Sequence, residues 1–259
     1  MPARRIHRPE GSHPEVDQLV GARRLLGKVA LVTGASRGIG LAIARALAAE
    51  GCELVLTARH SSTGKPAGRE GWRQGSRVPT TACDVRDPEQ VRALAAAIGK
   101  NFGRIDILVN NAGIAHLATP VRELPLAVWS DVLATNLTGT FLVTQAVLPL
   151  MQRGATIVNN LSIAATRVFP GSSAYNASKH GGLGLTNTLR EELRPQGIRV
   201  IALLPGATDT DIWKTLWPRA PRRKMMSADT VAAALVNALA LPPNSTVEEL
   251  TILPTGGAL

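Results

Sequence analysis

The sequence is poor in aromatic residues and contains a single tyrosine, Tyr175, among its 259 residues. Aromatic side chains make up only 3% of the chain, so the stacking platforms that bind single-stranded nucleic acid are largely missing. The net charge of +10 is spread over the chain, without any block of five or six like charges. Nucleic acid is therefore only a minor hypothesis for the partner of this basic protein.

Cysteine is scarce as well, since Cys52 and Cys83 are the only two and form neither a metal nor a redox spacing. No apolar run approaches the roughly 18 residues needed to cross a membrane. The first residues also lack the order of charge and hydrophobicity that marks a secretory signal. We therefore expect a soluble, cytoplasmic protein with no metal site and no membrane partner.

Residues 1–24 are rich in Arg, His, Pro and Gly, which predicts a flexible tail. No change in composition divides residues 25–259, which we expect to form one domain. Residues 60–76 show no confident element. Elsewhere, short apolar runs alternate with helical patterns: strands at 28–33, 53–58, 78–83, 105–110, 155–161, 198–204 and 250–253, and helices at 39–50, 88–100, 137–151, around Tyr175 to about 194, and 228–239. This alternation predicts an α/β Rossmann fold, a doubly wound parallel sheet of about seven strands with helices on both faces.

A glycine-rich turn, Thr-Gly-Ala-Ser-Arg-Gly-Ile-Gly at 33–40, follows the first expected strand. Glycines there let the backbone approach a pyrophosphate, and the helix that follows supplies N–H donors and a positive dipole. Any tight strand-to-helix turn favours glycine, so the turn alone is weak evidence. Its position after a strand strengthens the interpretation as a dinucleotide-binding loop.

Two arginines indicate which dinucleotide binds. NAD-binding folds place an acidic residue about 20 residues beyond the glycines, to accept the ribose 2′-hydroxyl. Here Arg59 stands 19 residues after Gly40, and no acidic residue lies between Leu54 and Lys65. A guanidinium binds a 2′-phosphate that a carboxylate would repel, and Arg37 in the loop would reach the same phosphate. The alternative is that both arginines are simply solvated. On the charge argument we favour NADP(H) over NAD.

Asp84 ends the third expected strand at its carboxyl edge, where ligands bind in such sheets. Its carboxylate would accept a hydrogen bond from the adenine amino group. The alternative is that Asp84 caps the helix that begins near Pro88.

Tyr175 and Lys179 stand four residues apart and share one face of the expected helix. An ammonium beside a phenol favours the phenolate, so we expect the pKa of Tyr175 to lie below its ordinary value of about 10. Tyr175 is then a candidate proton donor and acceptor. For a bare Tyr-x-x-x-Lys spacing, the alternative is a buried aromatic followed by a solvated lysine.

With further motifs in the same order, residues 26–253 resemble the classical short-chain dehydrogenase/reductase family. The motifs are the glycine-rich turn at 33–40, Asp84, Asn-Asn-Ala-Gly at 110–113, Asn136, Ser162, Tyr175 with Lys179, and Pro205-Gly206 with Thr210. The resemblance implies that Tyr175 is the general acid or base and that Ser162 holds the substrate oxygen. It further implies that Lys179 lowers the tyrosine pKa and binds the nicotinamide ribose, while Asn136 holds a water for proton relay. The cofactor-binding residues it implies are Gly34, Ser36, Arg37, Gly38, Ile39, Gly40, Arg59, Asp84, Val85, Asn110, Ala112, Gly113, Tyr175, Lys179, Pro205, Gly206 and Thr210.

The substrate side is expected to be mostly apolar, lined by Ile114, Val168, Phe169, Trp213, Leu216 and Trp217. His116 would touch the substrate, although a histidine in a loop is more often incidental. The loop 207–226 is expected to form a mobile lid, whose basic residues would meet a carboxylate or a carrier protein, or are simply solvated.

These features predict an NADPH-dependent reductase of a ketone or aldehyde, including 3-oxoacyl groups. The alternatives are an NADP-dependent dehydrogenase of small hydroxy acids, a 3-oxoacyl-carrier-protein reductase, and a regulator that binds NADP without catalysis. The chain end at 249–257 departs from the pattern expected of the carrier-protein reductases. The resemblance implies a homo-oligomer, a tetramer or dimer, built on the two long helices after strands four and five, with Gly181, Gly182 and Gly184 allowing close approach.

Overall fold

The computed structural model describes residues 23–59 and 80–257, so the expected tail at 1–22 and the uncertain stretch at 60–76 lie outside the described residues. Seven strands form one parallel sheet in the order β3-β2-β1-β4-β5-β6-β7. Their bounds are β1 Val29–Thr33, β2 Glu53–Ala58, β3 Thr80–Ala82, β4 Ile105–Asn110, β5 Met151–Asn160, β6 Arg199–Pro205 and β7 Glu249–Ile252. The predicted Rossmann fold is confirmed.

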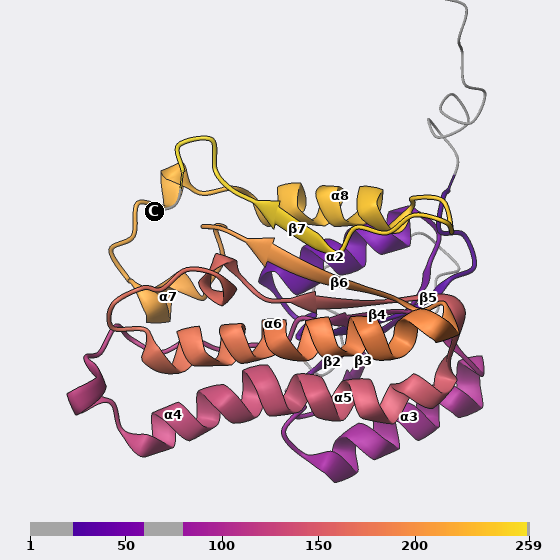
Figure 1. Ribbon diagram of the computed structural model, residues 1–259, viewed down its shortest axis with the longest axis horizontal. Coiled ribbons are helices and arrows are strands. Elements are labelled where there is room, and N and C mark those ends of the chain that lie inside the picture. The colour runs from indigo at the N-terminus through magenta and orange to yellow at the C-terminus, as the bar shows by residue number, and fades with distance from the viewer. Residues whose placement is uncertain (1–22, 60–79, 258–259) are drawn as a thin grey trace, which may run out of the picture.

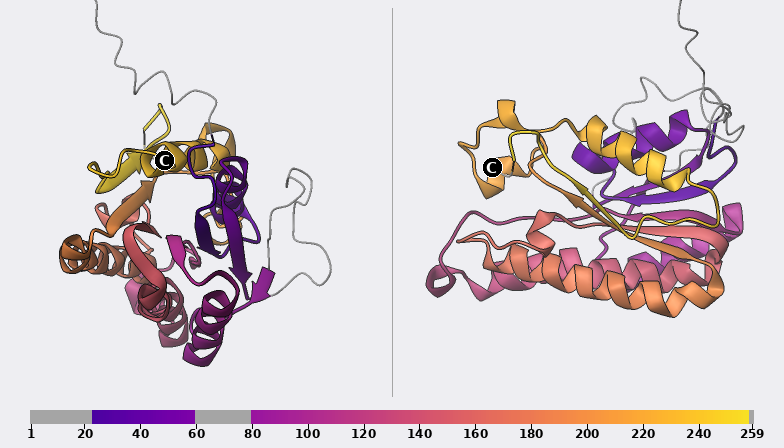
Figure 2. Two further views of the ribbon diagram at one scale, coloured as in Figure 1. Left: turned by 90° about the vertical axis from the view of Figure 1, so that its right-hand side faces the viewer. Right: turned by 45° about the horizontal axis from the view of Figure 1, so that its top comes forward.

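Helices cover both faces of the sheet (Figure 1). On one face, α2 (Gly38–Ala49) and α8 (Ala228–Leu239) pack over alternate strand residues such as Val32 and Leu203. On the other face, α3 (Pro88–Phe102), α5 (Gly139–Val147) and α6 (Ser173–Leu193) pack over the residues between them, such as Leu31 and Val200. Figure 2 shows the three layers from two further directions. Apolar burial on both faces explains why the strands are continuous apolar runs.

The helix expected at 137–151 begins earlier in the structure and contains a change of pitch. It starts with α4 (Leu126–Leu133), passes through a π-helical turn, η2 (Ala134–Thr138), and continues as α5 and a short 3-10 turn, η3 (Leu148–Leu150). The following strand starts at Met151 rather than 155, because Met151 pairs with Ile105 before an irregularity in the register.

This helix, Leu126–Leu150, is long and apolar enough to cross a membrane by length and composition alone, contrary to the expectation that no segment comes near that limit. Only 28% of its most apolar window is buried within the chain. Its neighbours among the described elements are α3, α6 and the strand β4. The helix therefore presents an uncovered apolar side, on which Phe141 is 43% exposed.

Two of the three glycines expected to allow contact between subunits are explained by packing inside the chain. A β-carbon at Gly181 would lie 2.9 Å from Leu137, and one at Gly182 would lie 2.7 Å from Leu161. At Gly184 no atom lies within 4 Å of that position. Only Gly184 is left without an explanation inside the chain.

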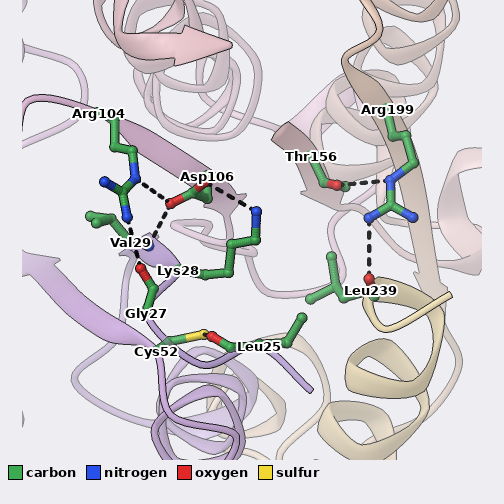
Figure 3. A network of polar contacts seen from close by, with 10 residues as sticks. All are labelled: Leu25, Gly27, Lys28, Val29, Cys52, Arg104, Asp106, Thr156, Arg199 and Leu239. Carbon is green, nitrogen blue, oxygen red and sulfur yellow. Dashed lines mark hydrogen bonds and ion pairs between the residues drawn. The ribbon is translucent and has the colours of Figure 1, made fainter. Parts of the chain in front are cut away.

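Polar contacts connect residues at the amino-terminal ends of the strands (Figure 3). Asp106 accepts hydrogen bonds from the backbone N–H of Val29 at 2.8 Å, from Arg104 Nε at 3.0 Å and from Lys28 Nζ at 3.3 Å. Arg199 donates to Thr156 Oγ1 at 3.1 Å and to the carbonyl oxygen of Leu239 at 3.1 Å. Because carbonyl groups at a helix end lack partners in the helix, Arg199 caps the end of α8.

Candidate active site

The loop between β1 and α2 takes a conformation that requires glycine. Gly34 has a φ of +64° and Gly38 a φ of +58°, a region that other residues enter only at a steric cost. A β-carbon at Gly40 would lie 2.2 Å from Nδ2 of Asn111. Backbone conformation and close packing therefore fix the glycine-rich turn that the sequence suggested.

The start of α2 fits the pyrophosphate of a dinucleotide. Arg37 at the N-cap makes no side-chain capping bond, and the first turn contains no acidic residue. The first backbone N–H groups of a helix have no partners within it and carry the positive end of the dipole. A phosphate group can therefore bind them directly, because the glycines leave the backbone accessible.

A cavity of about 850 Å³ extends from this loop along the carboxyl ends of the strands. It lies where strand order reverses around β1, with β2 on one side and β4 on the other, the usual ligand crevice of such sheets. Most of the residues expected from the sequence line it: Gly34, Ser36, Arg37, Gly38, Ile39, Gly40, Arg59, Val85, Ala112, Gly113, Ser162, Tyr175, Lys179, Pro205, Gly206 and Thr210. The structure thus brings the loop, the two arginines and the Tyr175 helix to one cavity.

Asn110, expected to line the ribose and to stabilise the central sheet, does not line this cavity. It is buried, and its Nδ2 donates to Thr144 Oγ1 and to Asn159 Oδ1, each at 2.9 Å. Side chains alternate across a strand, so the last residue of β4 turns into the helix-covered interior. Asn110 therefore stabilises the packing of β4, β5 and α5.

Asn111, which was not predicted, lines the cavity in its place. Its Nδ2 donates to the carbonyl oxygens of Thr33 at 2.9 Å and Gly34 at 3.1 Å. Its Oδ1 accepts from Asn160 Nδ2 at 2.8 Å, and Asn160 was also missed. The alternation of strand side chains was the signal that distinguishes Asn111 from Asn110.

Asp84 is expected to contact adenine, but it is bound by a neighbouring arginine and does not line the cavity. Arg86 donates through Nε to Asp84 Oδ1 at 2.9 Å and also forms an ion pair with Asp131 of α4. These contacts hold the pKa of the Asp84 carboxyl below its ordinary value, mainly through the hydrogen bond from Arg86. The alternative role as a helix cap does not apply either, since Asp87 caps α3.

Asn136 lies in the π-helical turn and is buried behind the cavity rather than on its wall. Its Oδ1 accepts from the backbone N–H of Ile114 at 2.8 Å, and its Nδ2 donates to the Ile114 carbonyl oxygen at 2.9 Å and to Ser178 Oγ at 3.0 Å. Asn136 therefore ties the loop after β4 to α6, which carries Tyr175 and Lys179. Single π-helical turns occur frequently at functional sites.

Tyr175 and Lys179 lie one turn apart on α6, with Lys179 Nζ 5.5 Å from the centroid of the Tyr175 ring. Both side chains are buried. Lys179 Nζ donates to the carbonyl oxygen of Asn160 at 3.1 Å. Ser162 precedes the short turn η4 (Ile163–Ala165), where its Oγ accepts from the backbone N–H of Ala164 at 3.1 Å, and it lines the same cavity as Tyr175. A phenol, a second hydroxyl and an ammonium therefore meet in one wall of the cavity.

The expectation that the pKa of Tyr175 lies below its ordinary value is wrong. Burial raises the pKa of the phenol, and the interaction with Ser162 opposes that rise only in part. Burial also lowers the pKa of Lys179 to about 8. Because charged forms are disfavoured away from water, the phenol keeps its proton at neutral pH, the state required of a proton donor.

The expected apolar side of the cavity is largely present. Ile114, Phe169, Trp213, Leu216 and Trp217 line it, whereas Val168 is 76% exposed outside it. His116 is buried, and its Nδ1 bonds to the carbonyl oxygen of Leu117, so it does not reach the cavity.

Both ends of the expected lid, residues 207–226, are joined to each other. Thr208 and Met226 form an isolated β-bridge, and the backbone N–H of Met226 donates to the carbonyl oxygen of Ala207 at 3.0 Å. Between these ends lie α7 (Trp213–Leu216) and the short turn η6 (Arg222–Lys224). Trp213 Nε1 donates to the carbonyl oxygen of Thr208 at 2.8 Å, which holds an apolar wall residue against the base of the loop.

Comparison with known proteins identifies the family of this chain. The model of the short chain dehydrogenase family matches residues 28–221. The chain is 42% identical to the D-threitol dehydrogenase of Mycolicibacterium smegmatis over 225 residues, which cover 82% of this chain and 86% of the relative. It is 41% identical to the 3-oxoacyl-[acyl-carrier-protein] reductase of a Synechocystis species over 195 residues, or 74% of this chain and 78% of the relative.

Among solved structures, a short chain dehydrogenase from Burkholderia cenocepacia in complex with NADP aligns with a TM-score of 0.78 at 36% identity. The alignment covers 89% of this chain and 98% of that one. The likeness therefore extends over nearly the whole length of that structure.

Proposed function

The chain belongs to the short chain dehydrogenase family of oxidoreductases, which act on alcohol and carbonyl groups, and on this premise we propose that it is an NADPH-dependent reductase of a mostly apolar ketone or aldehyde. The observation that carries the proposal is the convergence of Tyr175, Ser162 and Lys179 on the cavity that contains the phosphate loop. A nicotinamide cofactor supplies the hydride when it is bound, so the protein has to supply position and a proton.

In the proposed mechanism, Tyr175 donates the phenolic proton to the carbonyl oxygen as that oxygen becomes an alkoxide. The hydroxyl of Ser162, which lines the same cavity, holds the substrate oxygen next to the phenol. Lys179 lies close enough for its positive charge to stabilise the phenolate left behind. Asn136 and Asn160 hold α6 and Lys179 in position from behind the cavity wall.

The preference for NADP(H) rests on charge. Arg37 and Arg59 both line the cavity beside the phosphate loop, and both side chains are exposed to a ligand. A guanidinium pair suits a dianionic 2′-phosphate, for which a carboxylate at the end of β2 would be unsuitable. The structural relative that holds NADP supports the same choice.

The substrate class is proposed from the lining of the cavity. Trp213, Leu216 and Phe169 contribute apolar lining to the cavity, to which Tyr175, Ser162 and Lys179 contribute polar groups. 3-Oxoacyl groups fit this description, and a carrier-protein reductase is among the relatives. The D-threitol dehydrogenase relative keeps small hydroxylated compounds as the alternative.

The decisive experiment measures initial rates with NADPH and with NADH across ketoacids, acyl thioesters and aromatic ketones. We expect NADPH to be preferred and Tyr175→Phe to reduce kcat by roughly a hundredfold or more, because general acid catalysis typically contributes that much. Binding of NADPH, followed by fluorescence, should survive in Tyr175→Phe. A preference for NADH would contradict the assignment of Arg37 and Arg59.

A regulator that binds NADP without catalysis is the alternative from another class. Tight binding of NADPH with no turnover on any substrate of the panel would favour it. Against it stands the burial of Tyr175 and Lys179, because a buried ammonium costs stability and the fold gains nothing from it without chemistry to perform.

We also propose that the protein assembles with copies of itself through the uncovered side of the helix 126–150. That helix is apolar but mostly unburied, and exposed apolar surface of this kind marks protein interfaces. Gly184 on the neighbouring α6 has open space around it, which permits close approach of a second helix. Light scattering gives the assembly state, and a monomer would contradict this part of the proposal.

A further inference from the structure

The phosphate-loop residue Arg37 forms an ion pair with the lid loop. Its Nη1 lies 3.7 Å from Oδ2 of Asp211, and both residues line the cavity. Thr210, next to Asp211, packs over the same loop, since a β-carbon at Gly38 would lie 3.3 Å from Thr210 Cγ2. The lid therefore places a carboxylate beside the guanidinium that we assign to the 2′-phosphate.

A second contact fixes the direction of this carboxylate. Lys214, one helical turn further along, binds Asp211 Oδ1 through its Nζ at 2.7 Å. The other oxygen, Oδ2, is the one that faces Arg37. Lys214 and Arg37 therefore share the Asp211 carboxylate, each facing one of its two oxygens.

We propose that Asp211 is a specificity-determining residue that competes with the cofactor's 2′-phosphate for Arg37. The inference rests on the proposed function, because it assumes that the adenosine half of the cofactor binds beside the phosphate loop. A 2′-phosphate that reaches Arg37 either displaces the carboxylate of Asp211 or lies close to it. Either outcome weakens phosphate binding, since one guanidinium is shared between two anions. Asp211 thereby lowers the preference for a cofactor with a 2′-phosphate that Arg37 and Arg59 would give without it.

The size of the effect follows from exposure. The side chain of Arg37 is 72% exposed and that of Asp211 is 38% exposed, so water and salt screen their interaction. Exposed ion pairs typically change an equilibrium by about twofold to fivefold. Asp211 therefore adjusts the choice of cofactor rather than reversing it.

The test compares two probes that fill only the adenosine half, adenosine 2′,5′-bisphosphate and adenosine 5′-monophosphate. Calorimetry gives the ratio of their dissociation constants, which measures discrimination for the 2′-phosphate alone. In Asp211→Asn we expect this ratio to shift about twofold to fivefold toward the bisphosphate at low salt, and the shift to shrink at 0.5 M salt, an ionic strength at which screening is stronger.

Asp209→Asn is the matched control, because it removes the same charge two residues away. Asp209 is ion-paired with Arg222 inside the lid and does not line the cavity. The ratio should stay unchanged in this variant. An unchanged ratio in Asp211→Asn, or an equal shift in both variants, would overturn the inference.

Failure of the proposed cofactor choice is a separate outcome. If the proposed preference for NADP(H) is wrong, the wild-type protein binds the two probes with equal affinity. The inference about Asp211 is tested instead by the change in the ratio of dissociation constants that Asp211→Asn causes. A wild type without preference, combined with a variant that gains one, supports the role of Asp211 and rejects NADP(H) as the natural cofactor.

Discussion

Replacing Lys179 with methionine tests how deeply the structure buries this charge. Lys179 is 7% exposed, and burial lowers its pKa from an ordinary 10.5 to about 8. At about 1.36 kcal/mol per pKa unit, this difference corresponds to about 3 kcal/mol. That is the free energy by which the folded state disfavours the ammonium relative to the unfolded chain.

The direction of the pH dependence of stability follows from which state, folded or unfolded, binds the proton of Lys179 more strongly. Below about pH 8 both states are protonated, and the folded protein carries the full cost of a buried charge. As the pH rises from 8 toward 10.5, the folded state loses its proton first and is stabilised relative to the unfolded chain. Methionine has a similar length and no charge, so Lys179→Met should be free of this dependence.

Urea unfolding followed by tryptophan fluorescence, at one protein concentration and between pH 7 and 10, provides the measurement. We expect the stability of Lys179→Met relative to wild type to fall by about 2 to 3 kcal/mol over this range. The variant also loses the hydrogen bond from Lys179 to the carbonyl oxygen of Asn160 at every pH. This loss lowers the free energy of unfolding of the variant by a constant amount near neutral pH, and so does not create a pH dependence there. Lys100→Met on the exposed side of α3 is the control and should give a flat difference. A flat difference for Lys179→Met would refute the burial of its ammonium.

Two further predictions concern surfaces away from the reacting groups. Phe141→Asp should shift the protein to smaller assemblies in light scattering, because it puts a charge on the uncovered side of the helix 126–150, whereas Leu241→Asp beyond α8 should not. Equal behaviour of the two variants would reject that helix as the interface. Arg199→Ala should lower the free energy of unfolding by about 1 to 3 kcal/mol, since it leaves Thr156 and the end of α8 without a donor. Its kcat/KM should be unchanged, and Arg92→Ala, which breaks an exposed ion pair, should cost less than about 1 kcal/mol.

The fold was predictable because each parallel strand is buried on both faces and therefore appears as an apolar run. The phosphate loop and the Tyr175–Lys179 pair were predictable because their spacing is local. Features that depend on distant partners were not. The start of the long helix at Leu126 and its π-helical turn at Asn136 follow from packing on α6 rather than from the residues between them.

The same distinction explains where the site differs from the expectations drawn from the sequence. Asp84 has the right position in the sequence, but its carboxylate is already bound by Arg86. The four-residue spacing predicted that Lys179 lies beside Tyr175, but it gave the wrong direction for the pKa of Tyr175, because burial of the phenol raises that pKa and the interaction with Ser162 opposes the rise only in part. Burial is a property of the whole fold, and a four-residue spacing contains no information about it.

The pair formed by Asn111 and Asn160 has a consequence for redesign of the cofactor preference. Asn111 holds the carbonyl oxygen of Gly34, Asn160 holds Asn111, and the backbone of Asn160 holds Lys179. A phosphate loop grafted from an NAD-dependent relative would therefore alter the support of the lysine as well as the nucleotide contacts. If positions 111 and 160 are transferred together with the loop, the pH optimum of this protein should be kept. If the loop alone is transferred, the pH optimum should shift.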